Sequence, residues 1–218
     1  MFEVALSSLW SRRGSVMLTL ASLTISMAIV IGVEHVRAQA ENSFVRTVSG
    51  VDLLVGARTS QVNLLLYSVF RIGNATNNIR WQSYENITAR QGISWSIPFS
   101  LGDSHRGYRV LGTNTDYFEY FRYGNEQPLR LATGAPFENP LQAVLGSEVA
   151  TALVYSVGDE IVLSHGIGNT SFVNHENLPF TVSGILAPTG TPVDRTIHVT
   201  LQGVEAIHLG WQNGVQVA

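Results

Sequence analysis

Residues 16–33, VMLTLASLTISMAIVIGV, form a run of apolar and small residues without a charged side chain. A helix needs ~20 residues to cross the ~30 Å hydrocarbon core of a bilayer, and this run of 18 residues comes close to that length. Because backbone amides in lipid must be satisfied within their own segment, such an isolated run is expected to be helical. The run therefore predicts a single transmembrane helix near the amino terminus.

The charges that flank this run predict its orientation. Arg12 and Arg13 stand directly before it, whereas the charged residues between positions 34 and 41 roughly cancel one another. An excess of arginine favours the cytoplasmic side of a membrane. We therefore expect the amino terminus in the cytoplasm and the chain from about residue 36 onward on the outside.

The first 15 residues are expected to form a helix in the cytoplasmic interface, with Trp10 at the level of the lipid head groups. Its apolar face comprises Phe2, Ala5, Leu6, Leu9 and Trp10. A cleavable signal peptide is the competing interpretation, because Ala38-Gln39-Ala40 resembles a cleavage site. Signal cores run to ~7–15 residues, and the greater length of residues 16–33 favours a retained anchor. Both alternatives place the rest of the chain outside the cytoplasm.

Two residue types are absent, and each absence excludes a class of chemistry. Without cysteine the chain has no disulfide, no thiolate metal site and no thiol nucleophile. All 13 basic side chains are arginine, so the lysine of a nucleotide-binding P-loop and the amine of a Schiff base are both missing. We expect that this chain is not itself an ATPase. A net charge of −3 without a basic patch also argues against nucleic acid as a partner.

Beyond the apolar run, the pattern of the chain predicts an α+β fold with a mixed sheet. A period of four in Val36, Ala40, Phe44 and Val48 predicts that the membrane helix continues outward, packs this stripe on the domain and stops at Gly50. Helices are predicted after the caps Thr59 or Ser60, Thr115 and Ser147, and at residues 203–211. Strands are predicted at residues 51–57, 93–101, 107–113, 142–147, 157–164, 178–188 and 195–203.

The histidines invite a metal hypothesis. His165 and His175 flank a glycine- and asparagine-rich loop, Glu176 follows directly, and His105 lies in the segment DSHRG. Imidazole and carboxylate groups are ligands that suit zinc. No HExxH or other close ligand spacing occurs, which favours solvent-facing or structural histidines. No metal, cofactor or catalytic residue is therefore assigned from the sequence.

Hydrolysis by a serine nucleophile is a further alternative. Ser104-His105 and Ser164-His165 are adjacent pairs, and sequence neighbours do not place a base on the hydroxyl of a nucleophile as a triad requires. No GxSxG segment occurs. The sequence therefore disfavours a hydrolase.

The segment of residues 188–195, PTGTPVDR, predicts a constrained turn between two strands. Asp194 beside Arg195 suggests a local ion pair within it. Contact with a partner protein is the alternative role of this loop.

Several blocks of the sequence, taken in order, resemble one family. They are the membrane run, DLLVGA, LGDSHRGYRVLGT, NTDYF, AVLGSEVA, VGDEIVL and FTVSGILAPTGTPVDRTIHV, followed by a closing helix. Together they resemble the extracytoplasmic core domain of ABC transporter permeases of the FtsX and MacB type. This resemblance implies a cytoplasmic interfacial helix at residues 1–15, a transmembrane helix extending outward at 16–48 and a periplasmic MacB-like core domain at 49–218.

The resemblance also implies a function and a location. A separate ABC ATPase would drive the membrane helix, which would pass movement to the outer domain for export or for handling of lipoproteins or peptides. The implied setting is a bacterial inner membrane, with a dimer of permeases and a periplasmic or lipoprotein partner. Family permeases have four membrane helices, and no second apolar run of ~20 residues follows residue 33. We therefore expect an amino-terminal portion, or a second polypeptide that supplies the remainder.

A membrane-anchored periplasmic binding protein is the alternative function. Its ligand would be a divalent metal held by His105, His165 and His175. It would be expected to bind zinc alone, whereas a permease would be expected to accompany an ATPase.

Overall fold

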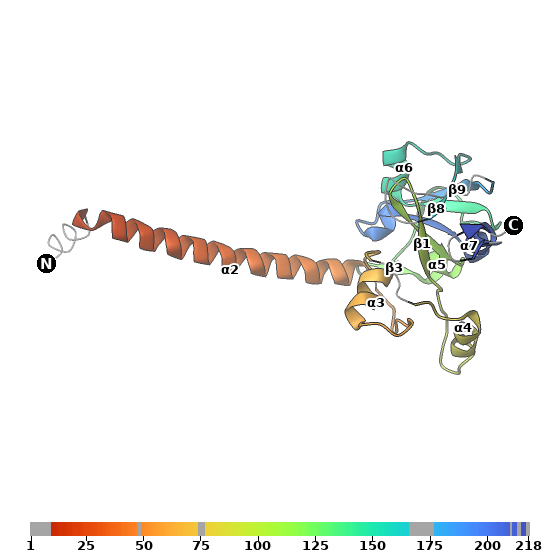
Figure 1. Cartoon of the computed structure of the whole chain (residues 1–218), viewed down its shortest axis with the longest axis horizontal. Coiled ribbons are helices and arrows are strands. Elements are labelled where there is room, and N and C mark those ends of the chain that lie inside the picture. The colour runs from red at the N-terminus through yellow and green to blue at the C-terminus, as the bar shows by residue number, and fades with distance from the viewer. Residues whose placement is uncertain are drawn as a thin grey trace. The chain divides into compact units, whose positions relative to one another are not determined.

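The computed structural model of the chain describes residues 10–47, 49–73, 77–165, 177–209, 211–212 and 215–216. At positions 40–46, 165, 211, 212, 215 and 216 it describes the backbone alone. The chain divides into two units, Met1–Phe44 and Val45–Ala218. The long helix α2 and the sheet of the second unit are drawn in Figure 1.

Helix α2, Arg13–Thr47, is 35 residues long and contains the whole predicted membrane run. In its apolar part the hydroxyls of Thr19 and Thr24 donate to carbonyl oxygens four residues earlier, at 2.9 and 2.8 Å. These bonds satisfy polar groups that lipid could not satisfy. In the described part of the chain, Arg13–Gln39 is the one stretch long and apolar enough to cross a membrane, a criterion that a signal sequence would also meet. At 1.5 Å per residue α2 extends about 52 Å, beyond the ~30 Å of a hydrocarbon core.

Both ends of α2 bear on the sequence predictions. Residues 1–9, and with them most of the predicted interfacial helix, lie outside the described residues, whereas residues 13–15 already belong to α2. At the other end the helix stops at Thr47, three residues before Gly50, which has the expected positive φ of 68°. Of the predicted apolar stripe, only Val36 has a described side chain, and it is exposed.

The second unit contains a mixed sheet. Its strands are β1 Ser100–His105, β2 Tyr108–Thr113, β5 Leu131–Gly134, β6 Gln142–Leu145, β7 Glu160–Ile161, β8 Ser164–His165, β9 Phe180–Leu186 and β10 Thr196–Thr200. Their order is β5-β9-β6-β10-β2-β1-β8, and β7 pairs with β9 outside this path. The pairs β2–β10 and β6–β9 are parallel, and the other pairs are antiparallel. The predicted α+β class with a mixed sheet is confirmed.

Both faces of this sheet are buried, as β10 illustrates. Ile197 and Val199 pack in a core cluster with side chains of α6, Ser147–Leu153, and α7, Leu201–His208. His198, between them, lies on the opposite face and stacks on Tyr117 of α5, Asp116–Tyr120, with ring centroids 4.9 Å apart. The sheet therefore lies between α6 and α7 on one side and α5 on the other. A strand covered on both faces has apolar residues at neighbouring positions, as Ala143, Val144 and Leu145 of β6 do, and this run made β6 predictable.

The caps of α3, α5 and α6 agree only in part with the predicted caps. Ser60 caps α3, Gln61–Ser68, as expected, because its Oγ accepts the Asn63 N–H at 3.1 Å. The prediction that Ser147 caps α6 is wrong, since Gly146 occupies the cap position and Ser147 is the first helical residue. Thr115 does hold the cap position of α5, but its side chain makes no capping hydrogen bond.

Two predicted strands are wrong. Residues 51–57 pair with no strand in the described part of the chain, and Leu53 is 74% exposed there. Of residues 93–101 only Ser100 and Leu101 enter β1, while Ile97 and Phe99 pack against the core without strand pairing. The strand predicted at 157–164 is divided into β7 and β8. Apolar composition does not supply the neighbouring backbone that a strand must bond.

Several short elements have no clear signal in the sequence. Helix α4, Trp81–Thr88, starts after Arg80, whose side chain makes no capping hydrogen bond. The others are a hairpin of β3, Arg122–Tyr123, and β4, Gln127–Pro128, a 3-10 helix η1, Pro192–Arg195, and a pair of β11, Trp211–Gln212, and β12, Val215–Gln216.

Candidate functional site

His105, the one predicted metal ligand with a described side chain, is buried at the end of β1. Its Nδ1 lies 2.7 Å from the Val162 carbonyl oxygen, and its Nε2 lies 2.9 Å from the Tyr155 hydroxyl. Because a carbonyl oxygen only accepts, Nδ1–H donates to Val162 and Nε2 accepts from Tyr155. Burial lowers the pKa of His105, which agrees with a neutral ring. Both nitrogens are engaged, so this histidine joins β1 to the segment before β8.

The other candidate ligands are only partly visible. The backbone of His165 lies in β8, where it pairs with Asp103 of β1. The side chain of His165, and the whole of His175 and Glu176, lie outside the described residues. Across the ranges that are described, no group of three or more His, Cys, Asp or Glu residues could hold a metal ion. Metal binding through His165 and His175 therefore stays a prediction.

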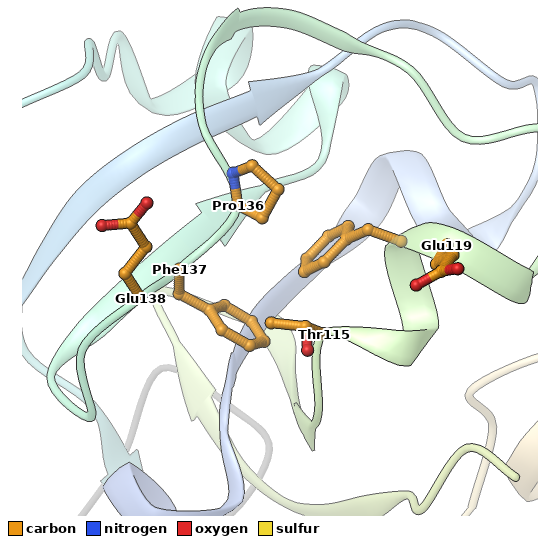
Figure 2. A pocket seen from close by; sticks show the side chains of 6 residues that line it. Thr115, Glu119, Pro136, Phe137 and Glu138 are labelled. Carbon is orange, nitrogen blue, oxygen red and sulfur yellow. The ribbon is translucent and has the colours of Figure 1, made fainter.

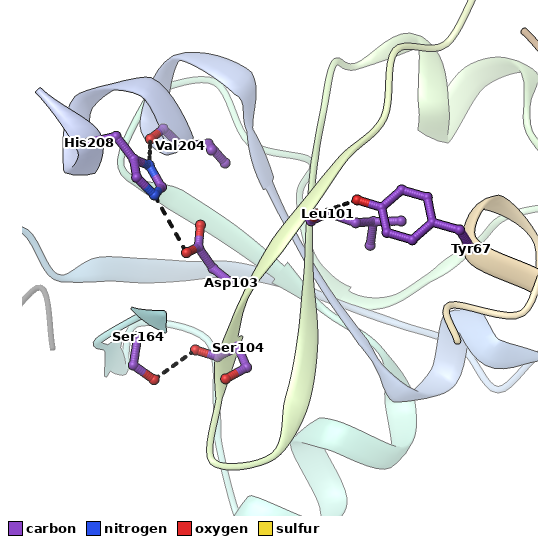
Figure 3. A network of polar contacts seen from close by, with 7 residues as sticks. All are labelled: Tyr67, Leu101, Asp103, Ser104, Ser164, Val204 and His208. Carbon is purple, nitrogen blue, oxygen red and sulfur yellow. Dashed lines mark hydrogen bonds and ion pairs between the residues drawn. The ribbon is translucent and has the colours of Figure 1, made fainter. Parts of the chain in front are cut away.

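Ser104 and Ser164 lie opposite each other in the β1–β8 pair (Figure 3). The Ser164 hydroxyl donates to the Ser104 carbonyl oxygen at 3.1 Å, and both residues are buried. The neighbouring His105 directs its two nitrogens to Val162 and Tyr155. A serine nucleophile requires a hydrogen bond to its base, and this geometry does not provide one from His105.

A contact between β1 and the last turn of α7 was not predicted. The Nε2 atom of His208 lies 3.6 Å from Oδ1 of the buried Asp103, and its Nδ1 donates to the Val204 carbonyl oxygen at 2.5 Å. Figure 3 shows the His208 ring between these two groups. The contact is an ion pair when the imidazole is protonated. No spacing rule connects residues that lie on such distant elements.

Arg71 is the second group that sequence reasoning missed. It follows α3 with a positive φ of 59°, and its side chain is buried. Its guanidinium donates to the Ser68 carbonyl oxygen and lies 4.5 Å from the centre of the Phe99 ring. Burial lowers the pKa of Arg71. Within the described residues no carboxylate forms an ion pair with this cation.

The charge of Arg71 contributes to the pKa shifts of two core residues. Burial raises the pKa of Tyr117 to about 12, and the charge of Arg71 opposes that rise. Burial lowers the pKa of His198 to about 3, and the Arg71 charge acts in the same direction. His198 Nδ1 lies 3.2 Å from the Val144 carbonyl oxygen, so the neutral ring donates there. These three side chains help to hold the segment after α3 against the sheet.

The loop of residues 188–195 is organised by Asp194. Its buried carboxylate accepts the N–H groups of Thr189 and Gly190 at 2.8 and 2.7 Å, and the Thr189 hydroxyl at 2.9 Å. The predicted ion pair between Asp194 and Arg195 is wrong, since Arg195 pairs with Glu148 of α6 at 2.6 Å. A carboxylate that accepts three donors fixes the turn between β9 and β10 more firmly than a surface ion pair would. The partner-contact alternative stays a prediction.

Residues 16–217 match the family model described as the MacB-like periplasmic core domain. The chain belongs to this family. The resemblance to a MacB-type core domain, predicted from the sequence blocks, is thereby confirmed.

Solved structures similar to this MacB-like chain are distant. The extracellular domain of the noncanonic ABC-type transporter YknZ from Gram-positive bacteria is 12% identical, with a TM-score of 0.41 over 59% of this chain and 65% of that chain. The periplasmic region of MacB from Actinobacillus actinomycetemcomitans is 14% identical, with a TM-score of 0.40 over 58% and 57%. A domain of a putative permease protein from Porphyromonas gingivalis is 9% identical, with a TM-score of 0.35 over 53% and 55%. The match thus spans less than two thirds of each of these chains, and no curated protein matches the sequence.

Proposed function

We propose that this chain is the membrane-anchored, amino-terminal portion of an ABC transporter permease. In this proposal α2 passes movement from a separate cytoplasmic ATPase to the MacB-like domain. The observation that carries it is the continuity of α2, which contains the candidate membrane span and whose last residues, 45–47, belong to the second unit. Because each residue of a helix is hydrogen-bonded to its neighbours along the axis, an uninterrupted helix transmits a displacement better than a flexible linker does.

The chain that leaves α2 is bonded to the sheet domain. Thr47 is buried, and the Ser49 N–H donates to the Arg122 carbonyl oxygen at 3.0 Å. The Ser49 hydroxyl in turn accepts the Glu126 N–H at 3.3 Å. These bonds tie the end of α2 to the β3–β4 hairpin, which directly follows α5. A displacement of Thr47 would therefore reach α5 and the sheet face that it covers.

The remaining parts of the proposal come from the family. ATP hydrolysis takes place in the partner ATPase, in agreement with the lack of lysine in this chain. The amino terminus lies in the cytoplasm and the domain in the periplasm of a bacterium, at the inner membrane, where two permeases pair. The cargo is of lipoprotein or peptide type, and a periplasmic or lipoprotein partner receives the movement.

Copurification tests the assembly. A tagged chain, solubilised from bacterial membranes in detergent, is expected to copurify with an ABC ATPase and with a polypeptide that carries further membrane helices. Recovery of the chain alone from the soluble fraction would overturn the proposal.

A break in α2 tests the coupling separately. Proline inside a helix removes a hydrogen bond and kinks it at a cost of about 3 kcal/mol. Gln39→Pro should keep the ATPase bound and the sheet folded, but should abolish the ATP-dependent change in amide hydrogen exchange of β1 to β10. Gln39→Ala, the matched control, should keep that change. An unaltered ATP response in Gln39→Pro would exclude transmission through α2.

A further inference from the structure

An open pocket between α5 and the loop before β6 has no part in the proposed function (Figure 2). Its volume is about 400 Å³. The residues that line it are Thr115, Phe118, Glu119, Pro136, Phe137 and Glu138. Two elements distant in sequence thus contribute apolar and acidic groups to one concave surface.

The base of the pocket is aromatic and held in place by the core. The rings of Phe118 and Phe137 meet edge to face, with centroids 5.1 Å apart, and Phe137 is buried. Phe118 also packs edge to face on Tyr117 and His198, at 5.6 and 6.1 Å. Side chains packed in this way cannot swing away when a ligand arrives, so the aromatic base is preorganised.

The two carboxylates lie on opposite sides of this base. Figure 2 shows Glu119 on one side of Pro136 and Phe137, and Glu138 on the other side. Both glutamates are exposed, and neither takes part in an ion pair within the described part of the chain. The turn that carries Glu138 is fixed, because the Gln142 side-chain oxygen accepts the Glu138 N–H at 2.7 Å.

The neighbouring polar groups leave the charge of the pocket negative. The Glu119 carboxylate interacts with the Tyr120 hydroxyl and raises the pKa of that tyrosine. The Arg122 guanidinium donates to the carbonyl oxygens of Glu119 and Phe121, at 2.6 and 3.0 Å, and does not line the pocket. An anion is therefore disfavoured there, and an uncharged apolar ligand would desolvate the carboxylates without compensation.

A cation on an aliphatic stem satisfies both parts of the surface. Its stem covers Pro136 and the partly exposed Phe118 ring, its charge gains from that ring, and its N–H groups reach the carboxylates. Pockets for free small molecules bury most of the ligand, whereas Thr115, Glu119 and Glu138 at the rim of this pocket are exposed. A larger partner that adds its own contacts around the rim compensates for this.

We propose that the pocket receives an arginine or lysine side chain, next to an apolar residue, from a partner polypeptide. The aromatic base and the acidic rim select this chemistry together. The proposal does not depend on coupling through α2, so either can fail alone.

Binding of short peptides to the full chain in detergent tests this proposal. The probes are immobilised peptides with the core Leu-Arg-Leu or Leu-Glu-Leu, and free butylguanidinium. The chain should bind the arginine peptide about tenfold or more tightly than the glutamate peptide. Two exposed ion pairs and one cation–π contact together can supply a difference in affinity of this size. The double variant Glu119→Gln/Glu138→Gln should lose about five- to tenfold in affinity for the arginine peptide. Glu205→Gln, which removes an exposed carboxylate of α7 outside the pocket, should lose nothing.

Three outcomes would overturn the proposal. The first is equal binding of the two peptides, and the second is undiminished binding by the double variant. The third is binding of butylguanidinium as tight as that of the arginine peptide, since the pocket would then serve a free organic cation. Both glutamates are exposed, so circular dichroism of the double variant should match that of the parent chain.

Discussion

At the scale of single residues, the fold strongly controls the protonation of His198. Its side chain is fully buried, and its pKa falls from the ordinary 6.5 to about 3, first through burial and then through the charge of Arg71. Between these values the unfolded chain binds a proton that the native chain excludes. The contribution of neutral His198 to the free energy of unfolding is therefore complete above about pH 6.5, and it is lost as the pH falls toward 3.

This shift predicts an acid-sensitive fold. From His198 alone, the free energy of unfolding should fall by up to about 1.4 kcal/mol per pH unit between about pH 6 and pH 4. Burial lowers the pKa of His105 as well, so that residue adds to the effect in the same direction. Urea unfolding of the full chain in detergent at a series of pH values measures the slope. His198→Asn should flatten the slope and the exposed-site control His35→Asn should not, and equal slopes in both would refute the assignment.

Gly146 is a position where the backbone leaves no room for a side chain. A Cβ added there would lie 2.3 Å from the Val193 carbonyl oxygen and 2.4 Å from that of Asp194. Gly146→Ala should therefore destabilise the chain by about 2–4 kcal/mol, since backbone rather than a flexible side chain must move. At Gly102 of β1 a Cβ would meet nothing within 4 Å, so Gly102→Ala should change stability by less than about 0.5 kcal/mol. Thermal denaturation compares the two, and equal losses would contradict the account of this contact.

The local roles of single residues could be predicted from the sequence, whereas their contacts with distant residues could not. Ser60 as a cap and Asp194 as part of a turn follow from local rules. The contacts of His105 with Tyr155, and of Arg71 with Phe99, depend on how distant segments meet in space. The aromatic and acidic pocket combines α5 with the loop before β6 for the same reason. A single sequence contains no local signal for such pairs.

At the scale of elements, the buried strands were predictable and the segment between α2 and β1 was not. Strand β6 is mostly apolar because both of its faces are covered, with Ala143 and Leu145 in one core cluster and Val144 in the other. Residues 51–57 are equally apolar, yet they are unpaired in the described structure and Leu53 is exposed. Composition therefore indicates where a strand could form, but the tertiary structure decides whether a neighbouring strand is present.

The end of α6 is a strained element that a single substitution should relieve. Val154, at the C-cap, has φ 58° and ψ 44° and is 85% exposed, so a β-branched residue occupies the left-handed conformation without gaining burial. That conformation costs about 1–2 kcal/mol for a residue with a Cβ, and glycine adopts it freely. Val154→Gly should therefore raise the free energy of unfolding by about 1 kcal/mol.

A second glycine substitution in α6 separates the relief of backbone strain at Val154 from the general effect of glycine on backbone flexibility. Thr151 is an exposed residue inside α6, so Thr151→Gly should lower the free energy of unfolding by about 0.3–0.5 kcal/mol. Denaturant titration of both variants gives the two values. A loss of stability in Val154→Gly would show that the left-handed turn is not strained.

At the scale of the whole molecule, helix α2 belongs to the first unit up to Phe44 and to the second unit from Val45. The apolar run predicted the long helix that contains the candidate membrane span, and the order of the sequence blocks predicted the MacB-like family. Helix α2 continues to Thr47, a residue of the second unit that is buried. Length and composition could predict the span, but they could not predict the bonds of Ser49 to the β3–β4 hairpin.

The absence of cysteine permits a direct test of the membrane arrangement. Single cysteines are introduced as Ser11→Cys, before the span, and as Glu205→Cys, on the exposed side of α7. Cells with a permeable outer envelope are then treated with a maleimide that cannot cross the inner membrane. The account predicts labelling of Glu205→Cys in intact cells and of Ser11→Cys only after lysis. Labelling of Ser11→Cys with protection of Glu205→Cys, or equal labelling of both before lysis, would contradict it.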